Sequence, residues 1–595
     1  MTQSPPWHVA ATALADAGCD VVIGLPSDEP GLMDAAEAQD RMRVIGVRDQ
    51  RVGACAAIGH ATSTGRPAVL AVESGPSFAN TLTGLLEASS LGAPIVVVTT
   101  RVPVDEIGRG AFQYTDQAGM AASLTKWRFL VERPQQLVWA LRRAVHLAVN
   151  GSPGVVLVEI AHEVLHATVE PPAAQGPVRR LRSAAAPEDV RAARELLTTA
   201  RLPVLLAGGG CATPHAHAGL RRLAEALGAP VFTTAAGRGA FDEQHPLACG
   251  LVGLYTTPPA DGLLADADVV VAVGSRLEET ARMGWDSFGS KRLIHIDATP
   301  DAFLAALEPA VALLGDAGVV LDQLLEGLVP SPEATTGRAA HVSSVREEMA
   351  RRYASPGVDA DQDAAPDAAP DPDAALTVRS ALGLLQETFD APTTVVQENG
   401  LHDMWGYHFP VLTVGEDTRV IVPGEQTMVG FGLPAAVGAA VADPARRTVL
   451  VCGDGALEMS TSALATAAEQ RCGITVLVLD NQGYGWPRLL RTTAGADIGA
   501  TRFRAPSLGP AAVLASGGWT TVVTTTGELR AALAEAAKVT ADGRTAVITV
   551  PVDDGDVPVG VRGLLGTPEE HTPGTPATAA PASASAPRSP GARPS

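Results

Sequence analysis

Two oxygen-bearing side chains in the last third of the sequence each follow an apolar run. Asp454 lies in a Gly-Asp-Gly turn directly after the run 448–452, and Asn481 comes 27 positions later, shortly after the run 474–479. A helix-length segment connects the two runs, so we expect two parallel strands whose carboxyl ends meet at one edge of a sheet. A carboxylate, an amide oxygen and the backbone carbonyl of Gly483 are hard ligands of the kind that Mg²⁺ or Ca²⁺ prefers. The spacing therefore predicts a metal site.

The glycines on either side of Asp454 suit a phosphate ligand. Gly453 and Gly455 carry no side chains, so the backbone there can approach an anion closely, and the helix that follows would add its N-terminal dipole. Mg²⁺ usually completes its coordination shell with substrate phosphates and water. A lone Gly-Asp-Gly is more often a simple turn, but the second turn, 480–483, at this spacing favours a magnesium and phosphate site.

The elements that must position these residues are short apolar strands that alternate with helix-length amphipathic segments. Runs rich in Val, Ile and Leu that are separated by helices indicate buried parallel sheets built from right-handed crossovers. Three such blocks, each of about 150–180 residues, account for the length of 595 residues. We therefore predict an α/β protein with three doubly wound parallel-sheet domains.

A weak internal repeat connects the first block with the third. Residues 56–76 can be laid on residues 435–455, with one or two positions of slippage, and both stretches read as a helix, a turn and a strand. Chance similarity between Ala- and Val-rich segments is the alternative explanation. If the repeat is real, the outer blocks share a fold and can face each other as a pseudo-symmetric pair.

Composition excludes several classes of function. The formal charge of −21 at pH 7 argues against nonspecific nucleic-acid binding, which needs a basic surface. No apolar run approaches ~18 residues, and the N-terminus has no basic start, so neither a membrane span nor a secretory signal is predicted. The six cysteines are scattered without a Cys-x-x-Cys pair, as expected for free thiols in a reducing cytoplasm. We expect a cytoplasmic protein with no nucleic-acid or membrane partner.

The segment 449–486 resembles the thiamine diphosphate (ThDP) motif, in which Gly-Asp-Gly is followed at this spacing by an Asn-rich turn. Residues 72–103 are similar to the Ser-Gly-Pro-Gly…Asn…Thr-Gly-Leu stretch of the acetolactate synthase-like (acetohydroxyacid synthase) branch, and 108–127 and 208–247 resemble further parts of that branch. This resemblance implies the three-domain architecture of ThDP-dependent enzymes. It divides the chain into an N-terminal pyrimidine-binding domain (1–175), a central domain (176–335), a partly disordered linker (336–378), a ThDP diphosphate- and Mg-binding domain (379–560) and a disordered tail (561–595).

The resemblance also implies roles for individual residues. In this family the two domains that enclose one cofactor come from different subunits, so a homodimer or homotetramer with active sites at the dimer interface is expected. The Mg²⁺ ligands match Asp454, Asn481 and the carbonyl of Gly483. The cofactor-binding positions match Pro26 and Asn80 near the pyrimidine, and His402, Val429, Gly453, Gly455 and Ala456 elsewhere along ThDP. Two polar positions near the substrate match Gln113 and Lys126. Packing or capping is the alternative role for Pro26, Asn80, Gln113 and Lys126.

At three positions where the family has cofactor-site residues, this sequence departs from the family pattern. The motif Arg-x-Glu-x-x-Ala places its catalytic Glu at Gln50, with Arg48 as its arginine. An amide can donate a hydrogen bond to the pyrimidine nitrogen N1′ but cannot transfer a proton, and loss of a positioned acid costs ~10²–10⁴ in rate. The adjacent Asp49 is not expected to take over, because neighbouring side chains point in different directions. Val429 is small for a position where the family keeps a bulky apolar residue, and Leu401 replaces a polar side chain.

The activity implied by the resemblance is that of a ThDP-dependent transferase or lyase. Such a carboligase decarboxylates pyruvate or a related 2-keto acid and transfers the acyl-anion equivalent to a second carbonyl. Residues 484–503 lack a diagnostic residue for branched-chain amino-acid synthesis, which favours a specialised pathway. Two alternatives stay open: a simple 2-keto acid decarboxylase, and a catalytically silent ThDP-binding regulatory paralogue. The glycine cluster in 206–211 is compatible with a nucleotide, so FAD on the central domain is a further open question.

Overall fold

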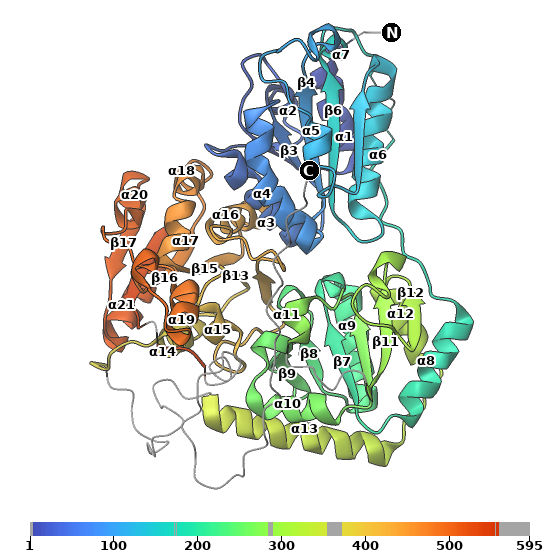
Figure 1. The fold of residues 1–595 in the computed structure, drawn as a ribbon, viewed down its shortest axis with the longest axis vertical. Helices are drawn as coiled ribbons and strands as arrows, with labels where there is room; N and C mark the ends of the chain where they lie inside the picture. Colours follow the sequence, from blue (N-terminus) through green and yellow to red (C-terminus); the bar gives the residue numbers. More distant parts are fainter. Residues whose placement is uncertain are drawn as a thin grey trace, which may run out of the picture.

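Three six-stranded sheets, each with helices against it, make up the part of the chain that the structure describes (Figure 1). The computed structural model describes residues 4–171, 173, 175–283, 290–353, 372–553 and 555–558. Every pair of neighbouring strands within the sheets is parallel. The prediction of an α/β protein with three parallel-sheet domains is confirmed.

The first sheet has the strand order β2-β1-β3-β4-β6-β5. Its strands are β1 (Val21–Gly24), β2 (Arg43–Gly46), β3 (Ala68–Val72), β4 (Ile95–Arg101), β5 (Trp127–Val131) and β6 (Val155–Ala161). Its helices are α1 (Pro6–Ala17), α2 (Leu32–Gln39), α3 (Gln50–Thr64), α4 (Pro76–Leu91), α5 (Gln117–Met120), α6 (Leu137–Val149) and α7 (His162–Leu165). The four inner strands, β1, β3, β4 and β6, consist mostly of buried apolar residues, because helices pack on both faces of the sheet. The edge strands β2 and β5 are largely half-buried.

The central sheet has the strand order β12-β11-β10-β7-β8-β9. Its strands are β7 (Pro203–Ala207), β8 (Val231–Thr233), β9 (Ala248–Leu251), β10 (Val269–Val273), β11 (Arg292–Asp297) and β12 (Val311–Leu314). Its helices are α8 (Pro187–Thr199), α9 (Pro214–Leu227), α10 (Pro258–Asp266), α11 (Glu279–Arg282), α12 (Ala317–Leu325) and α13 (Pro332–Tyr353).

Helix α13 spans the first part of the segment predicted as a linker, 336–378. Val342 and Met349, seven positions apart on α13, are fully buried in the core of the central domain. Helix α13 therefore packs on the central domain as far as Met349, whereas Tyr353 at its end packs in the core of the third domain. The other residues of this helix are mostly polar, so its two buried apolar residues are not evident in the sequence. The Asp/Ala/Pro repeats over 354–371 and the predicted tail at 561–595 lie outside the described residues.

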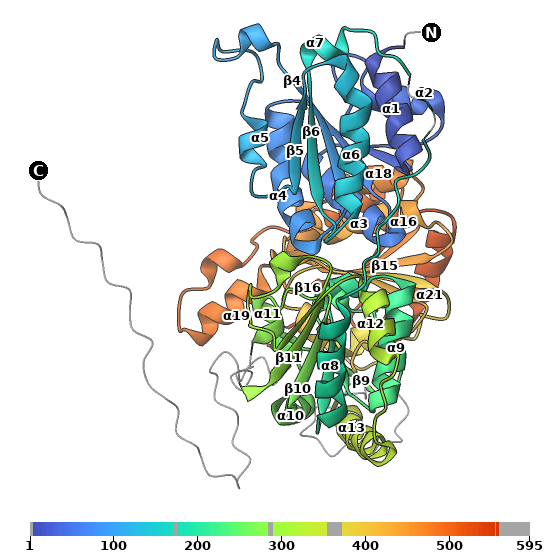
Figure 2. The ribbon, with the colours of Figure 1, turned by 90° about the vertical axis from the view of Figure 1, so that its right-hand side faces the viewer.

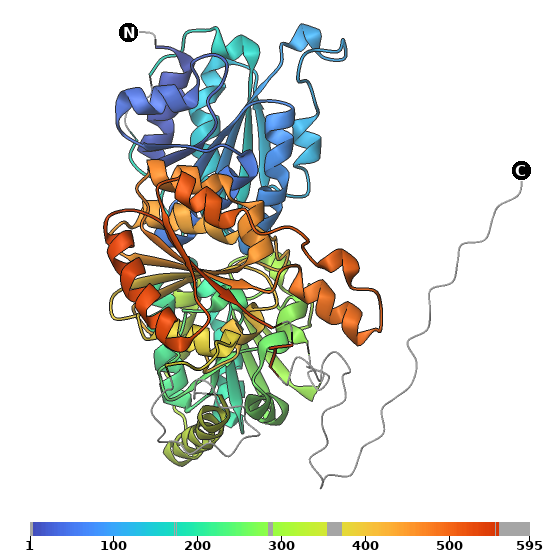
Figure 3. The ribbon, with the colours of Figure 1, turned by 90° about the vertical axis from the view of Figure 1, so that its left-hand side faces the viewer.

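The third sheet has the strand order β14-β13-β15-β16-β18-β17. Its strands are β13 (Thr393–Gln397), β14 (Thr418–Ile421), β15 (Arg447–Gly453), β16 (Ile474–Asp480), β17 (Trp519–Val522) and β18 (Ala546–Pro551). Its helices are α14 (Val378–Gln386), α15 (Asp403–Tyr407), α16 (Gly432–Ala442), α17 (Asp454–Met459), α18 (Ser462–Glu469), α19 (Gly485–Thr493), α20 (Gly509–Ala515) and α21 (Thr526–Ala541). This domain lies beside both of the others (Figures 1 and 3).

The first and third sheets have the same topology. When the strands are counted from one within each domain, both orders read 2-1-3-4-6-5. The predicted repeat is therefore real, and its helical parts are α3 and α16, which pack against each other where the two domains meet (Figures 1 and 2). One hydrophobic core continues through this contact. Among the described residues, no helix has the length and apolarity that crossing a membrane requires.

Candidate active site

A cavity of about 210 Å³ opens at the carboxyl ends of β15 and β16. These strands are adjacent and parallel, with Gly453 paired to Leu479, so the two turns that follow them lie side by side. All of the site residues predicted for this domain line the cavity: His402, Val429, Gly453, Asp454, Gly455, Ala456, Asn481 and Gly483. The structure thus brings the predicted metal and diphosphate residues together.

Asp454 connects the two turns. Its side chain is buried at the first residue of α17, and its Oδ2 accepts a hydrogen bond from the backbone N–H of Gly483 over 3.0 Å. Burial, together with the nearby carboxylate of Asp480, raises the pKa of Asp454 to about 7. A carboxyl group in such surroundings favours a cation beside it, because opposite charge stabilises the ionised form.

Arg488 supports the second turn, and sequence reasoning missed it. This buried residue of α19 donates to the backbone carbonyls of Asn481 and Gln482, each at 3.1 Å, and also to that of Thr501. Gly483 has no room for a side chain, since a Cβ atom there would meet the Arg488 guanidinium and the Thr501 carbonyl. The guanidinium therefore fixes the backbone that presents Asn481 and Gly483. A single arginine in an amphipathic helix carries no signal that distinguishes it from a surface residue.

His402 supplies a polar atom that has no protein partner. The side chain is 7% exposed, and burial lowers the pKa of His402 to about 4, so the imidazole is neutral near pH 7. Its Nε2 has no hydrogen-bond partner among the described residues, although buried polar atoms are normally paired. A polar ligand group in the cavity would satisfy it. Next to His402, buried Leu401 makes this part of the wall apolar, and half-buried Val429 lines the cavity further along.

Gln50 lies in the other outer domain, at the carboxyl edge of the first sheet. It is the first residue of α3, and its Oε1 accepts from Asn80 Nδ2 at 2.7 Å while its Nε2 donates to Ser77 Oγ at 3.1 Å. Asp49 is the N-cap of the same helix, and its carboxylate accepts from the backbone N–H groups of Arg51 and Val52. Asp49 is therefore used locally, in agreement with the expectation that it does not replace a catalytic acid.

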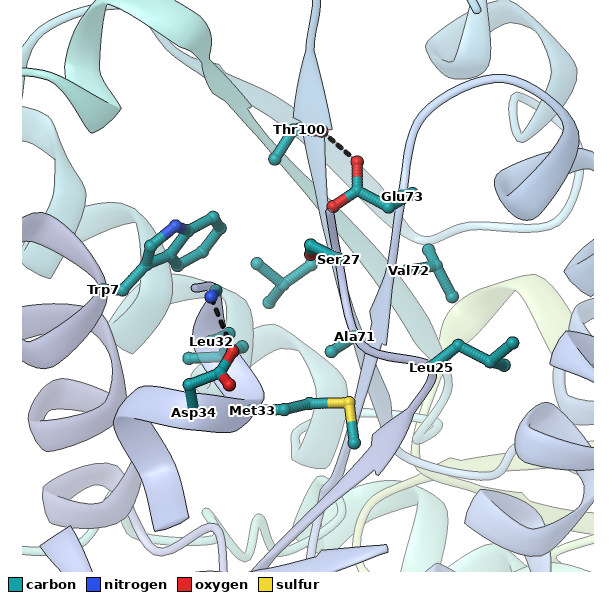
Figure 4. A pocket seen from close by; sticks show the side chains of 12 residues that line it. Trp7, Leu25, Ser27, Leu32, Met33, Asp34, Ala71, Val72, Glu73 and Thr100 are labelled. Carbon is teal, nitrogen blue, oxygen red and sulfur yellow. Dashed lines mark hydrogen bonds between the residues drawn. The ribbon is translucent and has the colours of Figure 1, made fainter. Parts of the chain in front are cut away.

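Pro26 and Gln113 lie at this same edge. Pro26 follows β1 and is exposed, and the two residues flanking it, Leu25 and Ser27, line a small cavity whose side chains are drawn in Figure 4. That cavity has a volume of about 20 Å³, room for about one water molecule. An aromatic ring does not fit inside it and would have to lie outside, over the sheet edge. The exposed residue Gln113 reaches the edge because its carbonyl lies against Gly75, at the start of α4.

Lys126 is not brought to this edge. It directly precedes β5 at the opposite, amino edge of the sheet, and its backbone N–H bonds the carbonyl of Val155 at the start of β6. Its ammonium donates to the carbonyls of Leu147 and Asn150, at 2.7 and 2.8 Å, and to that of Ser152. These carbonyls lie at and just beyond the end of α6, where a cation is stabilising. The placement favours the capping alternative for Lys126.

The two halves of the predicted site remain apart within one chain. Every described residue that lines the cavity around Asp454 lies between positions 378 and 556, in the C-terminal domain. Pro26, Gln50, Asn80 and Gln113 are therefore absent from its walls.

A separate cavity of about 260 Å³ lies where all three domains meet. The predicted glycine cluster enters it through Gly209 and Gly210, which follow β7, and Gly274, which follows β10, lies opposite them. A Cβ atom at position 210 would lie 2.7 Å from the Gly274 Cα, so the two turns can approach only as glycines. In the central sheet, β7 lies between β8, the next strand along the chain, and β10, which follows later. The strand order reverses its direction at this point, and open α/β sheets bind ligands at such a topological switch point.

Three family models match consecutive parts of the chain. Their descriptions are thiamine pyrophosphate enzyme, N-terminal TPP binding domain, over residues 8–120; thiamine pyrophosphate enzyme, central domain, over 190–324; and thiamine pyrophosphate enzyme, C-terminal TPP binding domain, over 398–550. The matches fall on the three parallel-sheet domains in order.

Curated relatives match over most of their length. The chain is 32% identical to the acetolactate synthase of Arthrospira platensis over 457 residues, which cover 75% of each protein. It is 32% identical to the acetolactate synthase large subunit of Parasynechococcus marenigrum over 506 residues, 82% of this chain and 78% of the relative. The acetolactate synthase large subunit of Mycobacterium tuberculosis is 30% identical over 485 residues, 80% of this chain and 76% of its own length.

Proposed function

The chain belongs to the acetolactate synthase-like branch of the thiamine pyrophosphate enzymes, and from that premise we propose that it decarboxylates a 2-keto acid such as pyruvate and transfers the acyl unit to a second carbonyl compound. The observation that carries this proposal is the convergence of eight residues, predicted from the sequence to bind the metal or the cofactor, on one cavity of the C-terminal domain. Thiamine pyrophosphate and ThDP are the same cofactor.

The donor set fits Mg²⁺ and a diphosphate. Asp454, Asn481 and the Gly483 carbonyl would hold the metal, because hard oxygen ligands suit Mg²⁺ and no Cys or His competes among them. Gly453 and Gly455 leave the backbone accessible, and the unpartnered Nε2 of His402 can bond a polar group of the ligand. When bound, ThDP supplies the nucleophilic carbon and the electron sink for decarboxylation.

The chain's own residues would bind and orient this cofactor. Leu401 and Val429 give the cavity an apolar side, which suits the uncharged parts of a bound organic molecule. At the pyrimidine, Gln50 would donate a hydrogen bond to N1′ but could not move a proton there. A carboxylic acid at this position would speed proton transfer at N1′. With Gln50 there, that proton transfer would have to involve the cofactor itself or solvent.

A second copy of the chain completes the site. We infer a homo-oligomer, a dimer or a tetramer, in which Pro26, Gln50 and Asn80 of one copy face the metal cavity of another. The support is that no described residue of the N-terminal domain lines that cavity in its own chain. The exposed loop that carries Phe112, 81% exposed, and Gln113 lies at the same edge as Gln50 and would be covered in such an assembly.

We infer that FAD, where the chain carries it, binds in the cavity between the three domains. Its glycine turns leave the backbone open to a dinucleotide, and Arg276 in its wall can pair with a phosphate. Asp297, at the end of β11, also lines it and can accept hydrogen bonds from a sugar hydroxyl. The visible absorption spectrum of the purified protein decides this point, because bound flavin absorbs there and the protein does not.

The reaction is tested by product analysis. Purified protein with ThDP and Mg²⁺ is incubated with a panel of 2-keto acids, with and without an added aldehyde or keto-acid acceptor, and CO₂ and carbon products are measured. A ligated product that needs the acceptor supports the proposal. Release of the aldehyde alone identifies a simple decarboxylase instead. If the wild type consumes no keto acid and Gln50→Glu restores turnover, the chain is a silent paralogue, which the combination of Gln50, Val429 and Leu401 favours as the second candidate.

A further inference from the structure

A chain of hydrogen bonds fixes which atoms of the Gln50 amide face which neighbour. It starts at Asp49, whose carboxylate caps α3 and can only accept. Asn80 Nδ2 lies 3.3 Å from Asp49 Oδ1, so the NH₂ group of Asn80 must point toward Asp49. The same Nδ2 donates to Gln50 Oε1 at 2.7 Å. The amide oxygen of Gln50 is therefore turned to Asn80.

The Gln50 nitrogen is then turned to Ser77. Nε2 donates to Ser77 Oγ at 3.1 Å, and Ser77 lies in the first turn of α4. An amide flip would place the NH₂ group of Gln50 against the NH₂ group of Asn80, two donors without an acceptor between them. Because an amide nitrogen carries two N–H groups, one remains for a ligand after Ser77 has taken the other. Gln50 is half-buried, so this N–H can still be reached.

Ser77 and Gln50 both differ from the residues that the family motifs have at these positions. The stretch around Ser77 resembles the family's Ser-Gly-Pro-Gly, yet it reads Ser74-Gly75-Pro76-Ser77 and so carries a hydroxyl at the last position. Gln50 stands where the family motif has Glu. In the structure the two departing side chains touch each other.

We propose that Ser77 is a positioning residue that, with Asn80, holds the Gln50 amide as a fixed hydrogen-bond donor, so that the site selects an aminopyrimidine whose ring nitrogen is unprotonated. This inference rests on the proposed function, because it names the cofactor ring as the ligand. A carboxylate at position 50 would behave differently. The Ser77 hydroxyl and the Asn80 NH₂ would both donate to it and keep it ionised to lower pH.

The first test measures the Kd of ThDP with Mg²⁺, from quenching of tryptophan fluorescence, without any turnover. Trp486 in the wall of the metal cavity is a suitable reporter. Ser77→Ala is expected to weaken ThDP binding about three- to tenfold, the range for one lost neutral hydrogen bond. Ser77→Thr keeps the hydroxyl and should bind as the wild type does. Ser89→Ala, at the other end of α4, is the matched control and should change nothing.

The second test uses pH, which a purely structural role of Ser77 would not affect. Wild-type binding should tighten as pH rises through the titration of the cofactor ring, whereas Gln50→Glu should reverse that trend. Adding Ser77→Ala to Gln50→Glu should move the midpoint of the reversed profile up by about one pH unit, a tenfold effect. Thermal unfolding of each variant confirms that it is folded.

The outcomes separate the inference from the function beneath it. A wild type that binds no ThDP overturns both. A wild type that binds ThDP, with Ser77→Ala identical to it in Kd and with no shift of the midpoint in the double variant, overturns the role of Ser77 and leaves the proposed function intact.

Discussion

Gly59 on α3 lies directly against the carbonyl group of Ala435 on α16, so closely that a Cβ atom at position 59 would overlap the carbonyl oxygen. Gly438 on α16 lies against the carbonyl group of Ala56 on α3 in the same way. The internal repeat aligns residue 56 with 435 and residue 59 with 438. The two contacts are therefore equivalent, and a pseudo-twofold axis that relates the first domain to the third also relates one contact to the other.

Gly59→Ala should destabilise the protein strongly. The added methyl group meets backbone in a continuous core, and overpacking of this kind costs about 1–3 kcal/mol or more. Gly337→Ala is the matched control, because Gly337 is an exposed residue of α13 with open space around it, and removing a helical glycine should stabilise by about 1 kcal/mol. Urea unfolding midpoints measure both. Similar midpoints for the two variants would contradict the close crossing of α3 and α16.

Arg488→Met should weaken Mg²⁺-dependent ThDP binding by about 10–100-fold, the usual effect of losing a residue that orients a metal ligand. The reason is that three backbone carbonyls around Asn481 and Gly483 lose their common donor. Arg491→Met removes an exposed arginine from the same helix and serves as the control. Titration of ThDP binding with Mg²⁺ gives the comparison, and equal Mg²⁺ requirements for both variants would show that Arg488 does not position the turn.

The residues of the candidate metal site could be brought together from sequence because their signal is local. A tight turn after a strand is indicated by the run Gly453-Asp454-Gly455. A second turn is indicated by Asn481, which follows after the length of one helix and one strand. Parallel pairing then places both turns at one sheet edge without further information. The shared topology of the outer domains was accessible in the same way, through the repeat of a helix and a strand.

Residues whose roles depend on distant contacts could not be predicted. Arg488 acts on carbonyls that only the folded turn brings to it. Lys126 follows the family pattern in sequence, yet its ammonium reaches the carbonyls beyond α6 because β5 and β6 are paired. The hydrogen bond from Gln50 to Ser77 joins positions 27 residues apart on two helices, and nothing in either segment alone indicates it.

Glu398 should make stability depend on pH. It is buried at the end of β13, and burial raises its pKa to about 7 from the ordinary 4.5, although the backbone N–H groups of Gly432 and Asn399 donate to it. Between those values the folded protein holds a proton that the unfolded chain has released, so stability falls as pH rises from about 4.5 to about 7, by about 3 kcal/mol at most.

The comparison with Glu398→Gln isolates this group. The variant cannot titrate at position 398, so its free energy of unfolding should fall less than that of the wild type between pH 5 and pH 8. Urea unfolding at both pH values measures the difference. Parallel pH profiles for the two proteins would show that Glu398 is ionised in the folded state across this range.

Two defective chains should complement each other if active sites form between subunits. Asp454→Asn removes a proposed metal ligand from the C-terminal domain, and a Gln50→Leu, Asn80→Leu double variant removes the polar contacts of the N-terminal domain. Each homo-oligomer then has only damaged sites. In a mixed dimer one site receives both damaged surfaces and the other receives neither, so random co-assembly should restore about a quarter of the wild-type ThDP-binding sites per chain.

Co-expression with two affinity tags, followed by ThDP-binding stoichiometry and CO₂ release from a responsive keto acid, measures this fraction. Sites formed within single chains would stay defective in every mixture, because each chain carries one of the two lesions. Complementation near a quarter therefore distinguishes a shared site from a self-contained one.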